Sequence, residues 1–452
     1  MTSGGTAKRK ALLLTLLSLA AGASVAVTVK VFAQNDVADQ EAQNASQMVV
    51  QGRRAFRFDT FGDESFWGDA IKLHLAIEGA KFGGTGPGLS PAAALSLGLK
   101  VDIAALPASL VTDLKNGAVD LNDPAVTLSL LQLNSVLGVT GFFQEGSSGL
   151  RSVGIQCALC HSLVDKSFSA PGIPPGNVGR RLDGWANRDL NVGAIVALAP
   201  DLQPIADVLD VDVATVLSVL QSWGPGKFDA ELLLDGQGFR PDGKTAATLI
   251  PPAFGLPGVN LHTWTGWGSV THWNAFVANI EMHGKGRFYD PRLNDAQQFP
   301  VAARNGFGNI QASPDEDRIT GKLGALHFYQ LAIPAPKPNV NSFDSAIKRG
   351  ESLFMGKAGC NNCHVKPLWT EPGWNLHTPS EVCVDNFQAN RAPDRRYRTA
   401  PLAGLFTHQK GGFYHDGRFA TLAEVVAHYN RCMSLNLQPD ETQDLVKFLL
   451  TL

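Results

Sequence analysis

The sequence has little net charge, no run of like charges and, after its first 33 residues, no long apolar run. Each of these absences excludes a class of protein or a kind of segment. The formal net charge is −3 over 452 residues, which excludes a broad nucleic-acid-binding surface. Without a run of like charges, the chain has no charged tail for binding a partner. After the first 33 residues, no segment is apolar enough to span a membrane. Hydrophobic residues make up 44%, enough for a chain of this length to bury globular cores.

The first 33 residues have the pattern of a segment that directs export. Residues 8–10 are Lys-Arg-Lys, and Ala11–Val29 is uncharged and largely apolar. Residues 31–33 then offer a small-residue cleavage site, so 1–33 is predicted to be a signal peptide. The alternative is an uncleaved anchor at 11–29, because a helix of that length reaches about 28 Å, close to the thickness of a bilayer core. Either interpretation exports the rest of the chain, and we expect it in the periplasm.

The six cysteines include two pairs with the same spacing, each followed directly by a histidine. The first pair lies in "GIQCALCH", and the second in "AGCNNCH". A random chain of this composition would hold roughly 0.002 copies of C-x-x-C-H, so two copies need a chemical cause. The residues concerned are Cys157, Cys160, His161, Cys360, Cys363 and His364.

Three chemistries use cysteine and histidine at short spacing. A structural zinc site would have to join the two copies across about two hundred residues, unlike compact zinc modules. A thioredoxin-like pair needs a βαβ context that the sequence does not show. Covalent haem needs two thiols on one helical turn for the vinyl groups and the next imidazole as an axial iron ligand. Export favours covalent haem, so we interpret the motifs as attachment sites for two haems c, with His161 and His364 on the irons.

Cys383 and Cys432 lie outside both motifs. In an exported chain they could form a disulfide, since both follow the second motif. The alternative is two unrelated buried thiols, and the sequence leaves both interpretations open.

The predicted fold class is mostly α, with two c-type cytochrome domains. Long loops are expected as well, because Gly and Pro are frequent, at 46 and 26 residues. The Pro-rich stretch 333–344 predicts a linker between an N-terminal domain at 34–332 and a C-terminal domain at 345–452. Polar residues 34–50 are expected to be loosely ordered. Apolar spacing predicts helices over 66–77, from Ser345, after Thr421 and over 438–452.

Several stretches together resemble the bacterial di-haem cytochrome c peroxidases. "QGRRAFRFD" resembles the opening helix of that family, and "GIQCALCH" and "RGESLFMGKAGCNNCH" are similar to its haem motifs. The most specific stretches are "RYRTAPLAGL" and "FYHDGRFATLAEVVAHY", which resemble its C-terminal signature. Residues 62–149 look like an insertion in the N-terminal domain that ordinary peroxidases lack. Rubber-cleaving di-haem oxygenases and tryptophan-modifying di-haem enzymes share the same arrangement of motifs, so the resemblance implies a class of protein rather than a particular substrate.

The resemblance assigns the second axial ligand of the C-terminal haem to the helix after the His-Asp-Gly signature. Family members use Met, His or Tyr there, and the matching position is His428, with Tyr429 next to it and Met433 beyond. The alternative for His428 is a surface position on the helix. His415 of the signature is expected to hydrogen-bond near a haem propionate, and its alternative is a turn residue.

For the N-terminal haem, the family has a Trp-Asp-Gly-Arg stretch followed by an acidic residue that handles peroxide protons. "HWNAFVANIE" places Trp273 and Glu281 at similar spacing, although the Gly-Arg is missing. Glu281 is therefore the candidate proton-transfer residue, and the alternative is a solvated helix position. His272 is a rival distal group or sixth ligand, as are His262 and His283.

Trp185, in "RLDGWANRD", resembles the tryptophan that lies between the two haems in the family and bridges electrons; simple packing is the alternative. The resemblance implies that the C-terminal haem passes electrons while the N-terminal haem reacts with hydrogen peroxide or dioxygen at an open site. The Trp-rich segment 261–274 is expected to form an apolar wall over that site. A small cytochrome or a cupredoxin would donate the electrons, and calcium is a candidate further cofactor.

Two other functions stay open. One is a di-haem electron carrier without a substrate, in which both irons have two axial ligands. The other is an oxygenase that cleaves an organic substrate with dioxygen, with 62–149 and the Trp-rich segment shaping its pocket. No nucleic acid is expected as a partner, and a membrane only through the N-terminal segment. A high-spin ferric haem would favour an enzyme, and two low-spin haems would favour the carrier.

Overall fold

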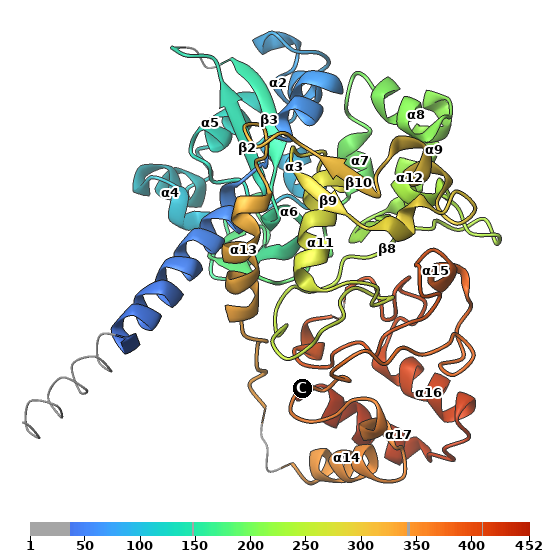
Figure 1. Cartoon of the computed structure of the whole chain (residues 1–452). Helices are drawn as coiled ribbons and strands as arrows, with labels where there is room; N and C mark the ends of the chain where they lie inside the picture. The colour runs from blue at the N-terminus through green and yellow to red at the C-terminus, as the bar shows by residue number, and fades with distance from the viewer. Residues whose placement is uncertain (1–36, 147–148, 341–343, 409) are drawn as a thin grey trace, which may run out of the picture.

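The computed structural model describes residues 37–146, 149–340, 344–408 and 410–452. The predicted signal peptide at 1–33 and the anchor at 11–29 lie outside these residues. Within them the fold is mostly helical, with short strands paired in twos (Figure 1), as the sequence predicts. No helix in the described part of the chain combines the length and the apolar character needed to cross a membrane.

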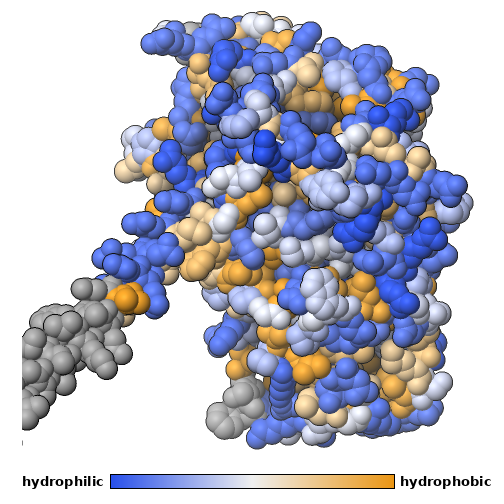
Figure 2. Space-filling model, viewed as in Figure 1, coloured by the Kyte–Doolittle hydropathy of each residue, from blue (hydrophilic) through white to orange (hydrophobic). Residues whose placement is uncertain are grey.

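The first described segment is a long helix over 37–58 that projects from the body of the protein (Figure 1). The prediction of loose order for 34–50 is therefore wrong over 37–50. The stretch holds three Ala and three Gln, residues that favour helix, although it is polar as a whole. Hydrophilic residues cover most of this helix (Figure 2), and only its end packs against the body. There a Cβ on Gly52 would lie 1.9 Å from the carbonyl oxygen of Ala325, so the two helices touch through their backbones.

Residues 62–149 lead into the first C-x-x-C-H motif through a hairpin. Strands β2 (Val139–Phe143) and β3 (Leu150–Ile155) pair antiparallel, and β3 ends just before Cys157. The helix predicted over 66–77 is broken at Lys72, whose φ is 59°. The other elements are η1 (Ser65–Ala70), α2 (Leu73–Glu78), η2 (Ala80–Phe82), α3 (Pro91–Ser96), β1 (Val101–Asp102), η3 (Ile103–Ala105), α4 (Ala108–Lys115) and α5 (Pro124–Gln132).

The elements that follow the first C-x-x-C-H motif pack with those that precede it around one large hydrophobic core, which includes Trp67 and Trp273. A second cluster packs Phe56, Ala158 and Met282 together. The elements are α6 (Ala158–His161), β4 (Ser162–Val164), β5 (Val178–Gly179), β6 (Arg181–Asp183), α7 (Val192–Val196), α8 (Gln203–Leu209), α9 (Val213–Trp223), β7 (Lys227–Phe228), α10 (Leu232–Asp235), β8 (Thr248–Leu249), α11 (Val270–Phe276), η4 (Val277–Glu281), β9 (Arg287–Tyr289), η5 (Pro291–Asn294), α12 (Pro300–Asn305), β10 (Asn309–Gln311) and α13 (Thr320–Ala332).

The described residues from 344 onward lie together at the lower end of Figure 1, around a third hydrophobic cluster. Helix α14 (Ser345–Met355) packs on α17 (Pro439–Leu449), and a Cβ on Gly350 would lie 2.0 Å from the carbonyl oxygen of Asp444. Helix α16 (Leu422–Cys432) begins at a capping box of Thr421 and Glu424. These three helices confirm the predictions made for this part of the sequence. The remaining elements are η6 (Cys360–Asn362), α15 (Phe387–Asn390) and η7 (Leu405–Thr407).

A buried ionic cluster joins this C-terminal part to the rest of the protein. Arg391, directly after α15, is 1% exposed. Its Nε and Nη2 donate to the two carboxylate oxygens of Asp235 at 2.7 and 2.9 Å. Its Nη1 lies 2.9 Å from Oδ1 of Asp229, which is also buried. The C-terminal part and the rest of the protein are therefore joined by ion pairs that are buried away from water.

Candidate functional site

The first C-x-x-C-H motif lies on one helical turn inside the protein. Cys157 precedes α6, and Cys160 and His161 belong to it. Burial raises the pKa of both thiols to about 12, so they are neutral. His161 Nδ1 lies 3.1 Å from the carbonyl oxygen of Pro251, and burial lowers the pKa of its imidazole to about 4. Because a carbonyl oxygen only accepts, Nδ1 carries the hydrogen, and Nε2 keeps the lone pair with which imidazole binds a metal.

The second motif presents its histidine in the same way from a different local structure. Cys360 begins the 3₁₀ turn η6, and Cys363 and His364 follow it. His364 Nδ1 lies 3.1 Å from the carbonyl oxygen of Trp369, and burial lowers the pKa of His364 to about 4. Both motifs thus hold a neutral imidazole, with its Nδ1 against a backbone carbonyl, beside two free thiols.

A cavity of about 380 Å³ lies beside the second motif and is lined by Cys360, Cys363 and His364. Two buried arginines also line it. Arg398 Nε, and both Nε and Nη1 of Arg188, have no hydrogen-bond partner among the described residues, and burial lowers the pKa of each arginine to about 10. A cavity with two thiols, a neutral imidazole and unpaired positive charge fits a haem, whose propionates would pair with the guanidinium groups.

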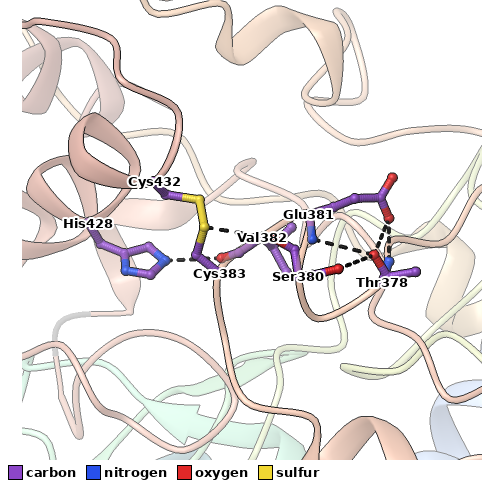
Figure 3. Close-up of a disulfide and its surroundings, with 7 residues drawn as sticks. All are labelled: Thr378, Ser380, Glu381, Val382, Cys383, His428 and Cys432. Carbon is purple, nitrogen blue, oxygen red and sulfur yellow. Dashed lines mark hydrogen bonds between the residues drawn. A yellow bond between two sulfur atoms is a disulfide. The ribbon is translucent and has the colours of Figure 1, made fainter.

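Tyr429 faces this cavity, whereas His428 does not. His428 Nε2 donates to the carbonyl oxygen of Val382 at 3.0 Å (Figure 3). Tyr429 and Met433, one turn apart on α16, line the cavity, and His428 is not among the lining residues. This geometry contradicts the expectation that His428 is the second axial ligand, because neighbouring positions on a helix point about 100° apart. The side chains of this helix end that line the cavity are those of Tyr429 and Met433.

His415 of the His-Asp-Gly signature lines the same cavity. Its ring stacks on Tyr397 with centroids 5.1 Å apart, and its Nε2 has no partner among the described residues. Its backbone carbonyl accepts a hydrogen bond from the amide of Leu249 at 2.6 Å, which ties it to β8. A buried imidazole with an unused nitrogen suits a contact to a propionate better than a turn position.

Glu281 is 7% exposed, which contradicts the alternative of a solvated helix position. It ends η4, whose Ala278 packs with Ala158 of the first motif in one hydrophobic cluster. Its Oε1 has no hydrogen-bond partner among the described residues. Burial raises the pKa of Glu281 well above its usual value, and the carboxyl groups of Glu231 and Asp229 raise it further. Glu281 is therefore a buried carboxyl group whose neutral form is favoured, with one oxygen that has no partner among the described residues.

The three rival histidines make packing contacts or backbone hydrogen bonds. His272 lies edge-on to Trp267, with ring centroids 5.2 Å apart, and its Nε2 lies 3.7 Å from a carboxylate oxygen of Asp290. Nε2 of His262 is 3.0 Å from a backbone carbonyl oxygen. His283 stacks on a phenylalanine ring at 3.6 Å. Each ring thus has a structural contact, although Nε2 of His272 keeps no hydrogen bond.

The Trp-rich segment packs into the core instead of forming an apolar wall over the first motif. The rings of Trp267, Trp273 and Phe276 meet edge to face, with centroids 4.8 to 5.6 Å apart. Trp264 lines the cavity of the second motif. Apolar residues have the same pattern in a core and in a pocket wall, so the sequence did not separate the two.

Trp185 lies on a line of aromatic rings between the two motifs. It packs in the same hydrophobic cluster as Cys157, and its ring centroid lies 6.2 Å from that of Phe254. Phe254 lies 6.3 Å from the ring of His408, and both line the cavity of the second motif. This arrangement suits a bridge for electrons.

Sequence reasoning did not single out Arg188 or Arg398. Arg398 stands in "RYRTAPLAGL", so the resemblance already contained the signal that could have found it. Arg188 lies far before the second motif in the chain, and no local pattern connects it with that motif.

No protein-family model matches the chain. The chain is 25% identical over 248 residues to the methylamine utilization protein MauG of Methylorubrum extorquens, covering 47% of this chain and 68% of that protein. It is 24% identical over 229 residues to the cytochrome-c peroxidase IdrP1 of Denitromonas iodatirespirans, covering 39% of this chain and 60% of that protein. The chain thus spans between 60% and 68% of the length of these two curated relatives.

Two solved structures show a low similarity of backbone. A MauG-like protein associated with microbial copper homeostasis has a TM-score of 0.33 and 16% identity, covering 51% of this chain and 80% of its own. The diheme peroxidase BthA from Burkholderia thailandensis has a TM-score of 0.31 and 19% identity, covering 51% and 78%. Both curated relatives carry names of the class that the two motifs and the C-terminal signature indicate. These similarities support placing the chain in the superfamily of di-haem cytochrome c peroxidases and MauG.

Proposed function

We propose that the chain is an exported di-haem c-type cytochrome that acts as a peroxidase-like oxidoreductase. The observation that carries this proposal is the matched geometry of the two motifs, each with two thiols on one turn and a neutral imidazole held by a backbone carbonyl. The two cysteines of each motif would attach one haem, with His161 and His364 as axial ligands. Bound there, the two haems supply the redox chemistry with peroxide or dioxygen, and the chain supplies orientation, charge and protons.

The two sites take different roles in this proposal. At the second motif, Tyr429 would be a further ligand of the haem and the arginines would pair with its propionates, which suits a centre that passes electrons from a small cytochrome or cupredoxin. On the side of the first motif, η4 shares a hydrophobic cluster with Ala158, and its buried Glu281 would supply the proton to the centre that meets the oxidant. Trp185 and Phe254 lie between them. The neutral, unpaired acid favours an enzyme over an electron carrier, which needs no proton donor.

The proposal divides the chain into an N-terminal haem domain at 34–332, with 62–149 as an insertion, a linker at 333–344 and a C-terminal haem domain at 345–452. The disulfide between Cys383 and Cys432 supports export to the periplasm, because disulfides persist in oxidising compartments. For calcium, no three carboxylates of the described residues lie within 4.8 Å of one another, and we propose no site for it.

The purified protein should carry two covalently bound haems c per chain. Both motifs present two free thiols on one turn, so neither should remain unmodified in a cell that attaches haem. Intact-mass spectrometry, together with an alkaline pyridine assay of haem content, checks this. A mass increase of one haem, or zinc in place of haem, would end the di-haem proposal.

The reduced protein should be reoxidised rapidly by hydrogen peroxide. The physical reason is that a centre with one protein ligand has an open position for an oxidant, while a centre with two must first lose a ligand. Stopped-flow absorbance of the reduced protein, mixed with peroxide or with air, measures the rate. A reoxidation no faster than that of a cytochrome with two axial ligands on each iron would replace the enzyme with the carrier. Reoxidation by dioxygen alone would point to the oxygenase.

A further inference from the structure

Helix α16 carries two pairs of side chains on neighbouring faces, and each pair is spaced by one turn. His428 and Cys432 form one pair and contact the segment 382–384 (Figure 3). Tyr429 and Met433 form the other pair and line the cavity of the second motif. Because successive helix positions point about 100° apart, the rotation of α16 decides which pair faces the cavity.

The segment 382–384 is fastened to α16 at two adjacent residues. The carbonyl oxygen of Val382 accepts a hydrogen bond from His428 Nε2 at 3.0 Å. Cys383 forms a disulfide with Cys432, with Cα atoms 6.0 Å apart. Val382 and Val384 also line the cavity, so the segment is part of its wall. The hydrogen bond and the disulfide therefore join the face of α16 that carries His428 and Cys432 to the segment 382–384, which is part of the cavity wall.

Other links at the last turns of α16 are two hydrogen bonds between Asn430 and Leu437 and ring contacts of His428 with Tyr414 and Phe419. The buried residues of this helix are Leu422 and Val426, both before His428. From His428 to the end of the helix no side chain is fully buried, and Met433, just past that end, is 47% exposed. Apolar packing alone therefore leaves this end free to rotate or fray.

We propose that the disulfide Cys383–Cys432 and the hydrogen bond from His428 to Val382 form a clamp that keeps Tyr429 at the axial position of the C-terminal haem. This inference rests on the proposed function. His428, Cys383 and Cys432 are positioning residues in it, since they act through Tyr429. Without the clamp, a rotation of about 100° would bring the imidazole of His428 to the same place, and a slip of one turn would bring the thioether of Met433 there; both groups bind haem iron readily. The clamp thus selects a phenol against two competing ligands on the same helix.

The test uses the full-length protein loaded with haem. The double variant Cys383→Ser/Cys432→Ser and the variant His428→Leu should lose the electron paramagnetic resonance and near-infrared signals of the wild-type C-terminal haem. The midpoint potential of that haem should rise in the double variant, because a His/Met iron has a higher potential. Adding Met433→Leu to the double variant should abolish the rise. His428→Gln, which can still donate to Val382, should restore part of the wild-type signal.

Arg431→Ala is the matched control, since Arg431 lies exposed on the same helix. It should leave the signals and the potential unchanged. A purely structural role would lower the unfolding temperature of the clamp variants but keep the wild-type signals, and that result would overturn the inference. Should the double variant fail to fold or to bind haem, the folded wild-type protein can be treated with a phosphine reductant, its two thiols alkylated and its irons reoxidised before measurement. Unchanged signals there would overturn the inference equally.

Tyr429→Phe separates this inference from the proposed function. If Tyr429→Phe has the spectrum of the wild type, the proposed ligation by Tyr429 is wrong, whatever the clamp does. If Tyr429→Phe changes the spectrum while the clamp variants keep it, the ligation stands and the clamp is wrong.

Discussion

Glu281→Gln should slow the reaction of the reduced protein with hydrogen peroxide by about a hundredfold or more, the usual contribution of a positioned acid–base group. A neutral carboxylic acid has an O–H donor and a C=O acceptor, so one side chain can give a proton to the leaving oxygen and take the proton of the other. Glutamine has the same volume and shape but cannot transfer a proton. The rate constant is measured by stopped flow, and the wild-type rate should also fall as the pH rises through the raised pKa of Glu281.

The absorption spectra of both haems should stay nearly unchanged in Glu281→Gln, because the residue moves protons and is not an iron ligand. Glu145→Gln, at an exposed position, serves as the control and should react at the wild-type rate. If Glu281→Gln reacts as fast as this control, the proton-transfer role of Glu281 is wrong. If its spectra change instead, Glu281 acts on the haem environment.

Arg391→Met should lower the free energy of unfolding by about 3 to 5 kcal/mol, the typical cost of removing one partner of a buried ion pair. The guanidinium group of Arg391 pairs with Asp235 and Asp229, and all three side chains are at most 1% exposed. Methionine fills similar space but leaves two carboxyl groups without water or a cation. Urea unfolding of the haem-loaded protein, followed by circular dichroism, measures the difference.

Lys366→Met is the matched control, because Lys366 pairs with Glu351 at 2.6 Å and both side chains are 45% exposed. Exposed pairs contribute little, so this variant should be close to wild type. The triple variant Arg391→Met/Asp229→Asn/Asp235→Asn should recover part of the lost stability, since it removes the unpaired charges. If Arg391→Met and Lys366→Met lower the free energy of unfolding equally, the buried cluster does not stabilise the junction between the two parts of the chain.

The residues that attach the proposed haems could be found in the sequence, because their chemistry requires a fixed local spacing. The choice between His428 and Tyr429 could not. The two positions are adjacent on one helix, and their directions depend on Val382 and Cys383, which are distant in sequence. The same reason applies to Arg188, which reaches the second cavity through the tertiary fold alone.

The burial of individual polar residues could not be predicted from the sequence either. Glu281 stands in a helical stretch where an acidic residue is normally solvated, and only the packing around η4 shows that it is buried. The helix over 37–58 illustrates the opposite case. Its residues have high helix propensity, so the sequence held the information, but polarity suggested disorder.

The backbone around Pro251 has a consequence for anyone who tries to engineer this protein. The Pro251 carbonyl oxygen holds the imidazole of His161, while Pro251, Pro252 and Phe254 line the cavity of the second motif. The strength of that hydrogen bond sets how much electron density the imidazole gives to its metal. A substitution that reshapes the second cavity here therefore also changes the electronic character of the first centre. The two centres cannot be retuned one at a time through this segment, and a redesign has to treat them as one coupled pair.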